Sequence, residues 1–214
     1  MTIRRVAFLF FTLIQLLTPL HIAAQTQVQQ LFNKVLYFDN GGLVGQSAVQ
    51  LLDDGPAGTR GAFAQKNLFY YGEKFYLSHQ WNQNALNNND VYLRTSSDGI
   101  SWSSRSIVND DPVGAQQRKS VMAIGGDPQQ PKICIVWQDQ RDAAYQLRAA
   151  VSTDGGQTFI PSVQISDHPT STDILADVSV DENGDFYVVW NRGSNGSYFQ
   201  TWFSRTSDYG QTWL

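Results

Sequence analysis

The chain has 214 residues, of which 42% are hydrophobic and 16% charged, so it can bury the core of a sizeable domain and is not disordered. Its formal net charge is −4, which argues against nucleic acid and anionic lipid as partners, because both need basic patches. The single cysteine, Cys134, excludes an internal disulfide. It lies in the apolar run KICIVW and is predicted to be buried.

Residues 1–24 are predicted to be a signal peptide. Two arginines near the start precede an apolar run that is short and interrupted by a proline, and small residues follow. Cleavage between Ala24 and Gln25 would take the formal charge from −4 to −6. A retained N-terminal anchor helix is the alternative. The sequence thus predicts a secreted protein, extracellular or periplasmic, with no membrane span after signal removal and a linker at residues 25–30.

A repeated pattern fills residues 31–214. The tight polar turns TSSDGISW, STDGGQTF and TSDYGQTW place Asp98, Asp154 and Asp208 at steps of 56 and 54 residues. Apolar segments that end in tryptophan (FYLSHQW, ICIVW and FYVVW) recur at a similar step. Self-similarity at a fixed period predicts a repeat architecture.

Each repeat is predicted to contain four short antiparallel strands. In the last unit ADVSVD leads through ENGD to FYVVW, and Asn-Gly between apolar runs is a strong hairpin signal. A third strand, YFQTWFSRT, follows, and a polar turn leads to a fourth strand, such as IPSVQIS in the preceding unit. The mature chain shows no helical periodicity, so the sequence predicts an all-β fold with units of propeller-blade size. It holds the back half of one unit, two whole units and three strands of another, about three blades of an incomplete ring.

The three turns resemble the Asp-box (BNR) repeat of the sialidase, or neuraminidase, superfamily, whose usual fold is a six-bladed β-propeller. The resemblance covers residues 31–214 and implies that the box turns join the third and fourth strands of each blade, opposite the catalytic face. Two turns match Ser/Thr-x-Asp-x-Gly-x-Thr-aromatic in full, and the first is one residue shorter. The box residues are Asp98, Gly99, Trp102, Ser152, Asp154, Gly156, Thr158, Phe159, Thr206, Asp208, Gly210, Thr212 and Trp213.

The box aspartates are predicted to fasten their turns and not to catalyse. A carboxylate in such a turn accepts hydrogen bonds from nearby backbone N–H groups, which use its acceptor capacity. The glycine supplies a backbone conformation that a Cβ would penalise, and the final aromatic ring is expected to pack between blades.

A sialidase-like active site implies three arginines for the sugar carboxylate, a tyrosine–glutamate nucleophile and an aspartate acid/base. The chain lacks the Arg-Ile-Pro signature of that family, and Arg60 and Arg118 match it only by their position at inner-strand starts. Its two glutamates, Glu73 and Glu182, fall in hairpin turns on the box face. No catalytic residue is therefore assigned, and the chain by itself is predicted to be non-catalytic.

The segment WQDQRD carries the most reactive-looking charges on the opposite face, and the equivalent loop WNRGSNG of the next unit keeps an arginine. A loop salt bridge is one interpretation, since exposed pairs contribute about 0–1 kcal/mol, and a glycan or anionic-ligand contact is the other. The predicted ligand-binding residues are Arg60, Arg118, Asp139, Arg141, Asp142 and Arg192.

Acidic pairs also recur before Gly or Pro, as Asp53-Asp54 and Asp110-Asp111, with Asp167-His168 in the third position. We interpret them as turn formers and not as calcium ligands, because no sequential calcium loop is present. No metal site and no cofactor is predicted.

The leading functional hypothesis is a secreted, sialidase-like module that presents a surface to a glycan or to another extracellular protein. Two alternatives stay open. One is an exo-sialidase, a glycoside hydrolase whose catalytic tyrosine and glutamate lie in blades beyond Leu214. The other is a protein-binding scaffold propeller of the kind seen in sortilin-type receptors. The sequence does not predict the oligomeric state.

Overall fold

The computed structural model describes residues 36–39, 42–46, 66–82, 89–111, 114–142, 144–167, 172–194 and 198–214. The predicted signal peptide and linker lie outside the described residues, as does Arg60. All regular elements in the described part are β-strands, which confirms the predicted all-β class.

Two short strands near the N-terminus form a sheet of their own. Strands β1 (Leu36–Asp39) and β2 (Gly42–Gln46) pair antiparallel, with Leu36 opposite Gln46. This hairpin falls in the region where the sequence predicts the back half of a unit.

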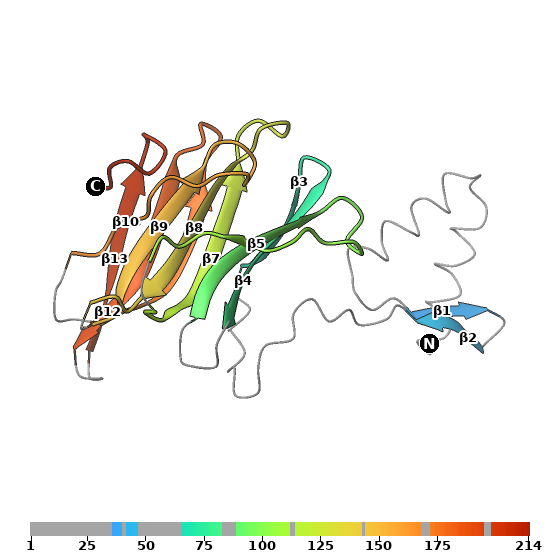
Figure 1. Cartoon of the computed structure of the whole chain (residues 1–214), viewed down its shortest axis with the longest axis horizontal. Coiled ribbons are helices and arrows are strands. Elements are labelled where there is room, and N and C mark those ends of the chain that lie inside the picture. The colour runs from blue at the N-terminus through green and yellow to red at the C-terminus, as the bar shows by residue number, and fades with distance from the viewer. Residues whose placement is uncertain are drawn as a thin grey trace, which may run out of the picture. The chain divides into compact units, whose positions relative to one another are not determined.

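Three further sheets follow in chain order, and in each of them consecutive strands pair antiparallel (Figure 1). The first contains β3 (Leu68–Tyr71), β4 (Lys74–Asn82), β5 (Asn89–Ser96) and β6 (Ser106–Ile107). The second contains β7 (Gln117–Gly125), β8 (Lys132–Asp139), β9 (Gln146–Ser152) and β10 (Val163–Gln164). The third contains β11 (Thr172–Val180), β12 (Phe186–Ser194) and β13 (Tyr198–Thr206). These sheets coincide with the predicted units, including the three strands of the last one.

Local hydrogen bonds fix the predicted Asn-Gly hairpin between β11 and β12. The Asp181 carboxylate accepts hydrogen bonds from the backbone N–H groups of Asn183 and Asp185, at 2.9 and 3.0 Å. Gly184 has a φ of 82°, in the left-handed region that glycine adopts without a steric penalty. The turn therefore sets the register in which Val180 faces Phe186.

The core lies between neighbouring sheets, in two clusters of buried apolar side chains. One joins the first and second sheets and includes Leu93, Ile133 and the fully buried Trp137. The other joins the second and third sheets and includes Val136 and Phe186. Cys134 is a free, buried cysteine in this latter cluster, as predicted. Burial of each large side chain contributes about 1.5–3 kcal/mol.

The last aromatic residue of each of two polar turns packs against the preceding sheet. Phe159 follows the third strand of the second sheet and lies against the cluster shared with the first sheet. Trp213 follows β13 and lies against the cluster shared with the second sheet. Each turn thus anchors its own sheet to the one before it.

The turn after β9 is held by the carboxylate of Asp154. The hydroxyls of Ser152 and Thr158 donate to its two oxygens at 2.7 and 2.6 Å, and the Thr158 N–H donates at 3.0 Å. The Ser152 hydroxyl also accepts a hydrogen bond from the Gly156 N–H at 2.8 Å. These contacts occupy the carboxylate within its own turn.

The turn after β13 repeats the same pattern around Asp208. Here Thr206 and Thr212 donate hydroxyl hydrogen bonds at 2.7 and 2.6 Å, and Gly210 donates its N–H to Thr206 Oγ1 at 2.9 Å. In the shorter turn after β5, Asp98 accepts from the backbone N–H groups of the residues two and three positions on, at 2.8 and 2.7 Å.

The Asp208 carboxyl group is expected to titrate far below its ordinary range. Hydrogen bonds from Thr212, through its hydroxyl and then its N–H, and from Thr206 lower the pKa of Asp208 to about 2. Because the folded pKa lies below the unfolded value of about 3.9, the turn is stabilised above that value, and this contribution is lost as the pH falls through 2. Carboxyl carbon NMR should show this pKa, and Thr212→Val should raise it; an unchanged titration in the variant would contradict the assignment.

Candidate functional site

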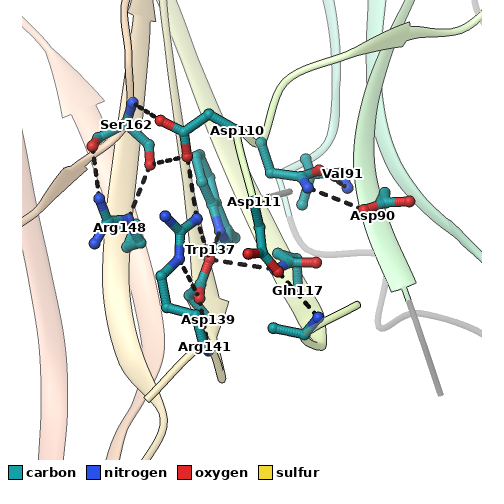
Figure 2. Close-up of polar contacts among 12 residues, drawn as sticks. Asp90, Val91, Asp110, Asp111, Gln117, Trp137, Asp139, Arg141, Arg148 and Ser162 are labelled. Atoms are coloured by element: carbon teal, nitrogen blue, oxygen red, sulfur yellow. Dashed lines mark hydrogen bonds and ion pairs between the residues drawn. The ribbon is translucent and has the colours of Figure 1, made fainter. Parts of the chain in front are cut away.

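A polar network joins β7 and β8 to the segment after β6, at the ends of the strands away from the polar turns (Figure 2). Strand β8 runs from Lys132, beside the β7–β8 turn, to Asp139 at this end. The segment after β6 contributes Asp110 and Asp111, so the network connects the first sheet to the second.

Asp139 is the central acceptor of the network, although its side chain is only 1% exposed. It accepts hydrogen bonds from the Trp137 indole N–H at 2.9 Å and from the N–H, Nε and Nη2 of Arg141 at 2.9, 2.9 and 3.0 Å. Burial alone would raise the pKa of Asp139, but the hydrogen bonds from Arg141 and Trp137 outweigh it and lower this pKa below its ordinary value. The group therefore stays ionised and has no proton to donate as a general acid.

Arg141 links this carboxylate to the preceding sheet. Its Nη2 lies 3.1 Å from Asp110 Oδ1, and Asp110 also accepts hydrogen bonds from the N–H and hydroxyl of Ser162 at 2.7 and 2.6 Å. Arg148 donates to the Ser162 hydroxyl and carbonyl oxygens at 2.9 and 2.7 Å. The chain of contacts ties the segment after β6 to the segment before β10.

The same arrangement recurs one sheet further on, around Asp173. This carboxylate is fully buried and accepts from the Trp190 indole at 3.0 Å and from Arg192 Nε at 2.8 Å. Arg192, which is 6% exposed, also pairs with Asp167 of the preceding sheet at 2.9 Å. The Gln138 side-chain amide donates to the Asp173 backbone carbonyl oxygen at 3.1 Å, which adds a further contact between the second and third sheets.

Both networks combine an indole, a buried carboxylate and a guanidinium that reaches an aspartate after the last strand of the preceding sheet. Asp110 and Asp167, which the sequence marked as recurrent, occupy this last position. In the first sheet the strand register places His79, and not a tryptophan, at the position of Trp137 and Trp190. The repeat of the networks indicates a latch between adjacent sheets.

The structure separates the predicted ligand-binding residues into different environments. Asp139, Arg141 and Arg192 belong to the two latches, and Asp139 is the last residue of β8 and is buried, contrary to the expectation of an exposed loop residue. Asp142 is exposed and takes no part in either latch as described. Sequence reasoning missed Asp173, because its pairing with Arg192 follows from the β11–β12 register and not from any spacing in the chain.

Arg118, like Asp142, stands apart from the latches. It is the second residue of β7, as expected for an inner-strand start, and its guanidinium lies 3.7 Å from the centre of the Tyr145 ring. No hydrogen bond or ion pair reaches this guanidinium within the described ranges, and its Nε is buried without a partner. Arg94, Arg141, Arg148 and Arg192 all have hydrogen-bonded partners.

A bulge next to Arg118 shapes this end of β7. The register shifts between Arg118 and Val121, and Lys119 has a φ of 53°. Residues at the same repeat position in the other sheets, Lys66 and Leu175, have φ values of 41° and 55°. A positive φ at a non-glycine residue is uncommon, and such strain clusters at functional sites. Burial and the charge of Arg118 lower the pKa of Lys119.

Among the described residues, this site has positively charged side chains that can bind an anion, but no pair of catalytic residues. Both glutamates, Glu73 and Glu182, lie in exposed hairpin turns at the opposite strand ends from Arg118. Within the described ranges no group of three or more His, Cys, Asp or Glu side chains could hold a metal ion. Among these residues there is likewise no helix long and apolar enough to cross a membrane.

No protein-family model and no curated protein matches the chain. Solved structures do. An α-L-arabinanase from Penicillium chrysogenum, complexed with arabinobiose, has a TM-score of 0.50 and 17% identity over 78% of this chain and 51% of that protein. At this identity the likeness shows the fold alone, and together with the antiparallel sheets it identifies a β-propeller, here with about three blades.

Two more distant structures are also glycoside hydrolases. The α-L-arabinofuranosidase Arb93A from Fusarium graminearum has a TM-score of 0.47 and 14% identity, covering 64% of this chain and 42% of that one. A thermostable family-43 glycoside hydrolase has a TM-score of 0.46 and 12% identity, covering 69% and 51%. The chain spans about half the length of the arabinanase.

Proposed function

We propose that this protein is a secreted, sialidase-like Asp-box propeller module that binds an acidic sugar through Arg118. The observation that carries the proposal is a half-buried guanidinium, stacked on Tyr145, to which no partner in the described part of the chain is bound. By contrast, hydrogen bonds within the protein engage Arg94, Arg141, Arg148 and Arg192.

A carboxylate is the ligand group that fits Arg118 best. A guanidinium presents a planar fork of donors that matches the two oxygens of a carboxylate, and such charge-assisted pairs are strong. The Tyr145 ring, whose hydroxyl donates to Gln116 at 2.9 Å, limits the orientations of the fork. Lys119 adds a second positive charge beside it. The preorganised fork would therefore lose little entropy on binding.

Binding without catalysis is the form of the proposal that the described residues support. Asp139 is held ionised by its hydrogen bonds, and Asp173 is fully buried in the second latch. Neither glutamate lies at this end of the strands. The similar Penicillium chrysogenum arabinanase was solved with arabinobiose, which makes carbohydrates the first ligands to test. Signal cleavage after Ala24 and an extracellular or periplasmic location belong to the proposal.

Isothermal titration calorimetry of the purified protein with N-acetylneuraminic acid and D-glucuronic acid tests it. We expect saturable binding of at least one acid, weakened about 10- to 100-fold in Arg118→Met, because one charge-assisted hydrogen bond contributes about 1.5–3 kcal/mol. Arg205→Met, which removes an exposed arginine of β13, is the matched control and should leave affinity unchanged.

Equal affinity in the Arg118→Met and wild-type proteins would overturn the proposal. Absence of binding to both acids would also overturn it. If the purified protein bound another protein and neither acid, the scaffold alternative would be favoured. Release of sialic acid from a fluorogenic sialoside by the purified protein would contradict binding without catalysis and favour a sialidase.

A further inference from the structure

A second candidate site lies at the opposite strand ends, where the first and second sheets meet beside the polar turn of Asp154. A pocket of about 330 Å³ opens there, lined by side chains that include Lys74, Tyr76, Thr95, Ser104 and Gln129. Its volume falls at the lower end of the range of about 300–1,000 Å³ that is typical of small-molecule sites.

Two glycines let the walls of this pocket approach closely. A Cβ at Gly72, in the β3–β4 turn, would overlap the carbonyl oxygen of Pro128 in the β7–β8 turn. A Cβ at Gly156 would overlap the Leu93 side chain at the pocket floor. Both glycines have positive φ values, of 53° and 85°. The walls of the pocket are therefore turns whose close approach depends on glycine.

Tyr76 brings to this pocket a hydroxyl group that is open to a ligand. Its side chain is 2% exposed and lines the pocket from β4, opposite Thr95 on β5. No hydrogen bond reaches its hydroxyl in the described part of the chain. The hydroxyl reaches the open space of the pocket, so a ligand group there can form a hydrogen bond with it. Burial raises the pKa of Tyr76, so the hydroxyl remains neutral and can donate as well as accept.

The remaining lining indicates a neutral ligand rich in hydroxyl groups. Thr95 and Ser104 bring hydroxyl groups, and Gln129 brings an amide, around a floor that includes Leu93. One ammonium, Lys74, and one carboxylate, Asp154, balance each other, and the oxygens of Asp154 are occupied within its turn. A sugar ring has hydroxyl groups at its edge and C–H groups on its faces, which suits a polar wall with an apolar floor.

We propose that this pocket binds one neutral sugar residue, with the Tyr76 hydroxyl hydrogen-bonded to a sugar hydroxyl and the ring seated on Leu93. The site is separate from Arg118, because it is built from β4, β5, the β7–β8 turn and the polar turn after β9, whereas Arg118 is at the other end of β7. It goes beyond the proposed acidic-sugar site in its place and in the charge of its ligand.

Saturation-transfer difference NMR of the purified protein with D-glucose, D-galactose and L-arabinose tests the proposal. At least one of these sugars should give a saturable signal. Tyr76→Phe, which removes only the hydroxyl, should weaken that sugar about 2- to 10-fold, the loss of one neutral hydrogen bond. Ser104→Trp places an indole at the exposed mouth and should abolish the signal.

Two controls separate this site from other surfaces. Tyr70→Phe changes an exposed tyrosine of β3 outside the pocket and should leave affinity unchanged, as should Arg118→Met. Loss of the signal in Arg118→Met, equal effects of the Tyr70 and Tyr76 variants, or the absence of a signal with all three sugars would overturn the proposal. Retained neutral-sugar binding in a protein that binds no acidic sugar would support this site while contradicting the proposed function.

Discussion

Replacing Asp173 with alanine is expected to lower the free energy of unfolding by about 3–5 kcal/mol, because it leaves a buried guanidinium without its main counter-ion. Asp173 is fully buried and accepts hydrogen bonds from Trp190 at 3.0 Å and from Arg192 at 2.8 Å. After the change, the one ion-pair partner left to Arg192 among the described residues would be the exposed Asp167, at 2.9 Å. Urea unfolding, followed by tryptophan fluorescence, measures the loss.

A conservative variant and a surface variant define what this result means. Asp173→Asn keeps the side-chain volume and one acceptor for Trp190 but loses the charge. Its free energy of unfolding should therefore lie between those of the wild type and Asp173→Ala. Asp142→Ala removes an exposed aspartate and should change stability by no more than about 0.5 kcal/mol. Similar effects of Asp142→Ala and Asp173→Ala would contradict the latch.

Gly156→Ala is expected to lower the free energy of unfolding by about 2–5 kcal/mol, although it adds a single methyl group. Gly156 has a φ of 85°, where any L side chain is strained by about 1–2 kcal/mol. Its Cβ would also overlap Leu93 of the preceding sheet and lie 3.3 Å from Ile133 Cδ1, and overpacking costs about 1–3 kcal/mol. Gly210, at the same position one sheet on, would meet Val151 at 2.7 Å, so the close approach repeats.

The neighbouring glycine provides the matched control. Gly155 has a similar φ of 75°, but a Cβ there would meet only Pro131, at an ordinary 3.5 Å. Gly155→Ala should therefore cost only the backbone strain of about 1–2 kcal/mol. Urea unfolding of both variants distinguishes the two contributions. Equal losses would show that Gly156 does not hold the sheets in close contact.

The strand order was predictable from the sequence because local signals carry it. Tyr198–Thr206 was expected as a strand and is β13, and the Asn-Gly turn before Phe186 lies where hairpin chemistry places it. The bulges at Lys119 and Leu175 were not predicted, since neither residue is a type that favours a positive φ. Their conformation depends on tertiary packing that no local pattern reports.

The candidate site was predicted less well, for a related reason. The arginines were selected by residue type, but whether each is paired depends on which aspartate the fold brings to it. Arg192 reaches Asp173 through strand register and Asp167 through contact between sheets. Tyr76 was not singled out, because nothing in the sequence shows that its hydroxyl faces a pocket. Two recurrences pointed to the latches: that of Asp110 and Asp167, and that of an arginine, Arg141 or Arg192, shortly after the tryptophan of its unit.

The Arg118 side chain itself gives the most direct test of the proposed function. In a protein labelled with ¹⁵N at arginine, the Arg118 Nε–H signal should shift saturably as N-acetylneuraminic acid or D-glucuronic acid is added. The Nε–H signals of Arg148 and Arg192, which are engaged within the protein, should stay in place. Saturable shifts at those arginines with none at Arg118, or no saturable shift at any arginine, would contradict the account.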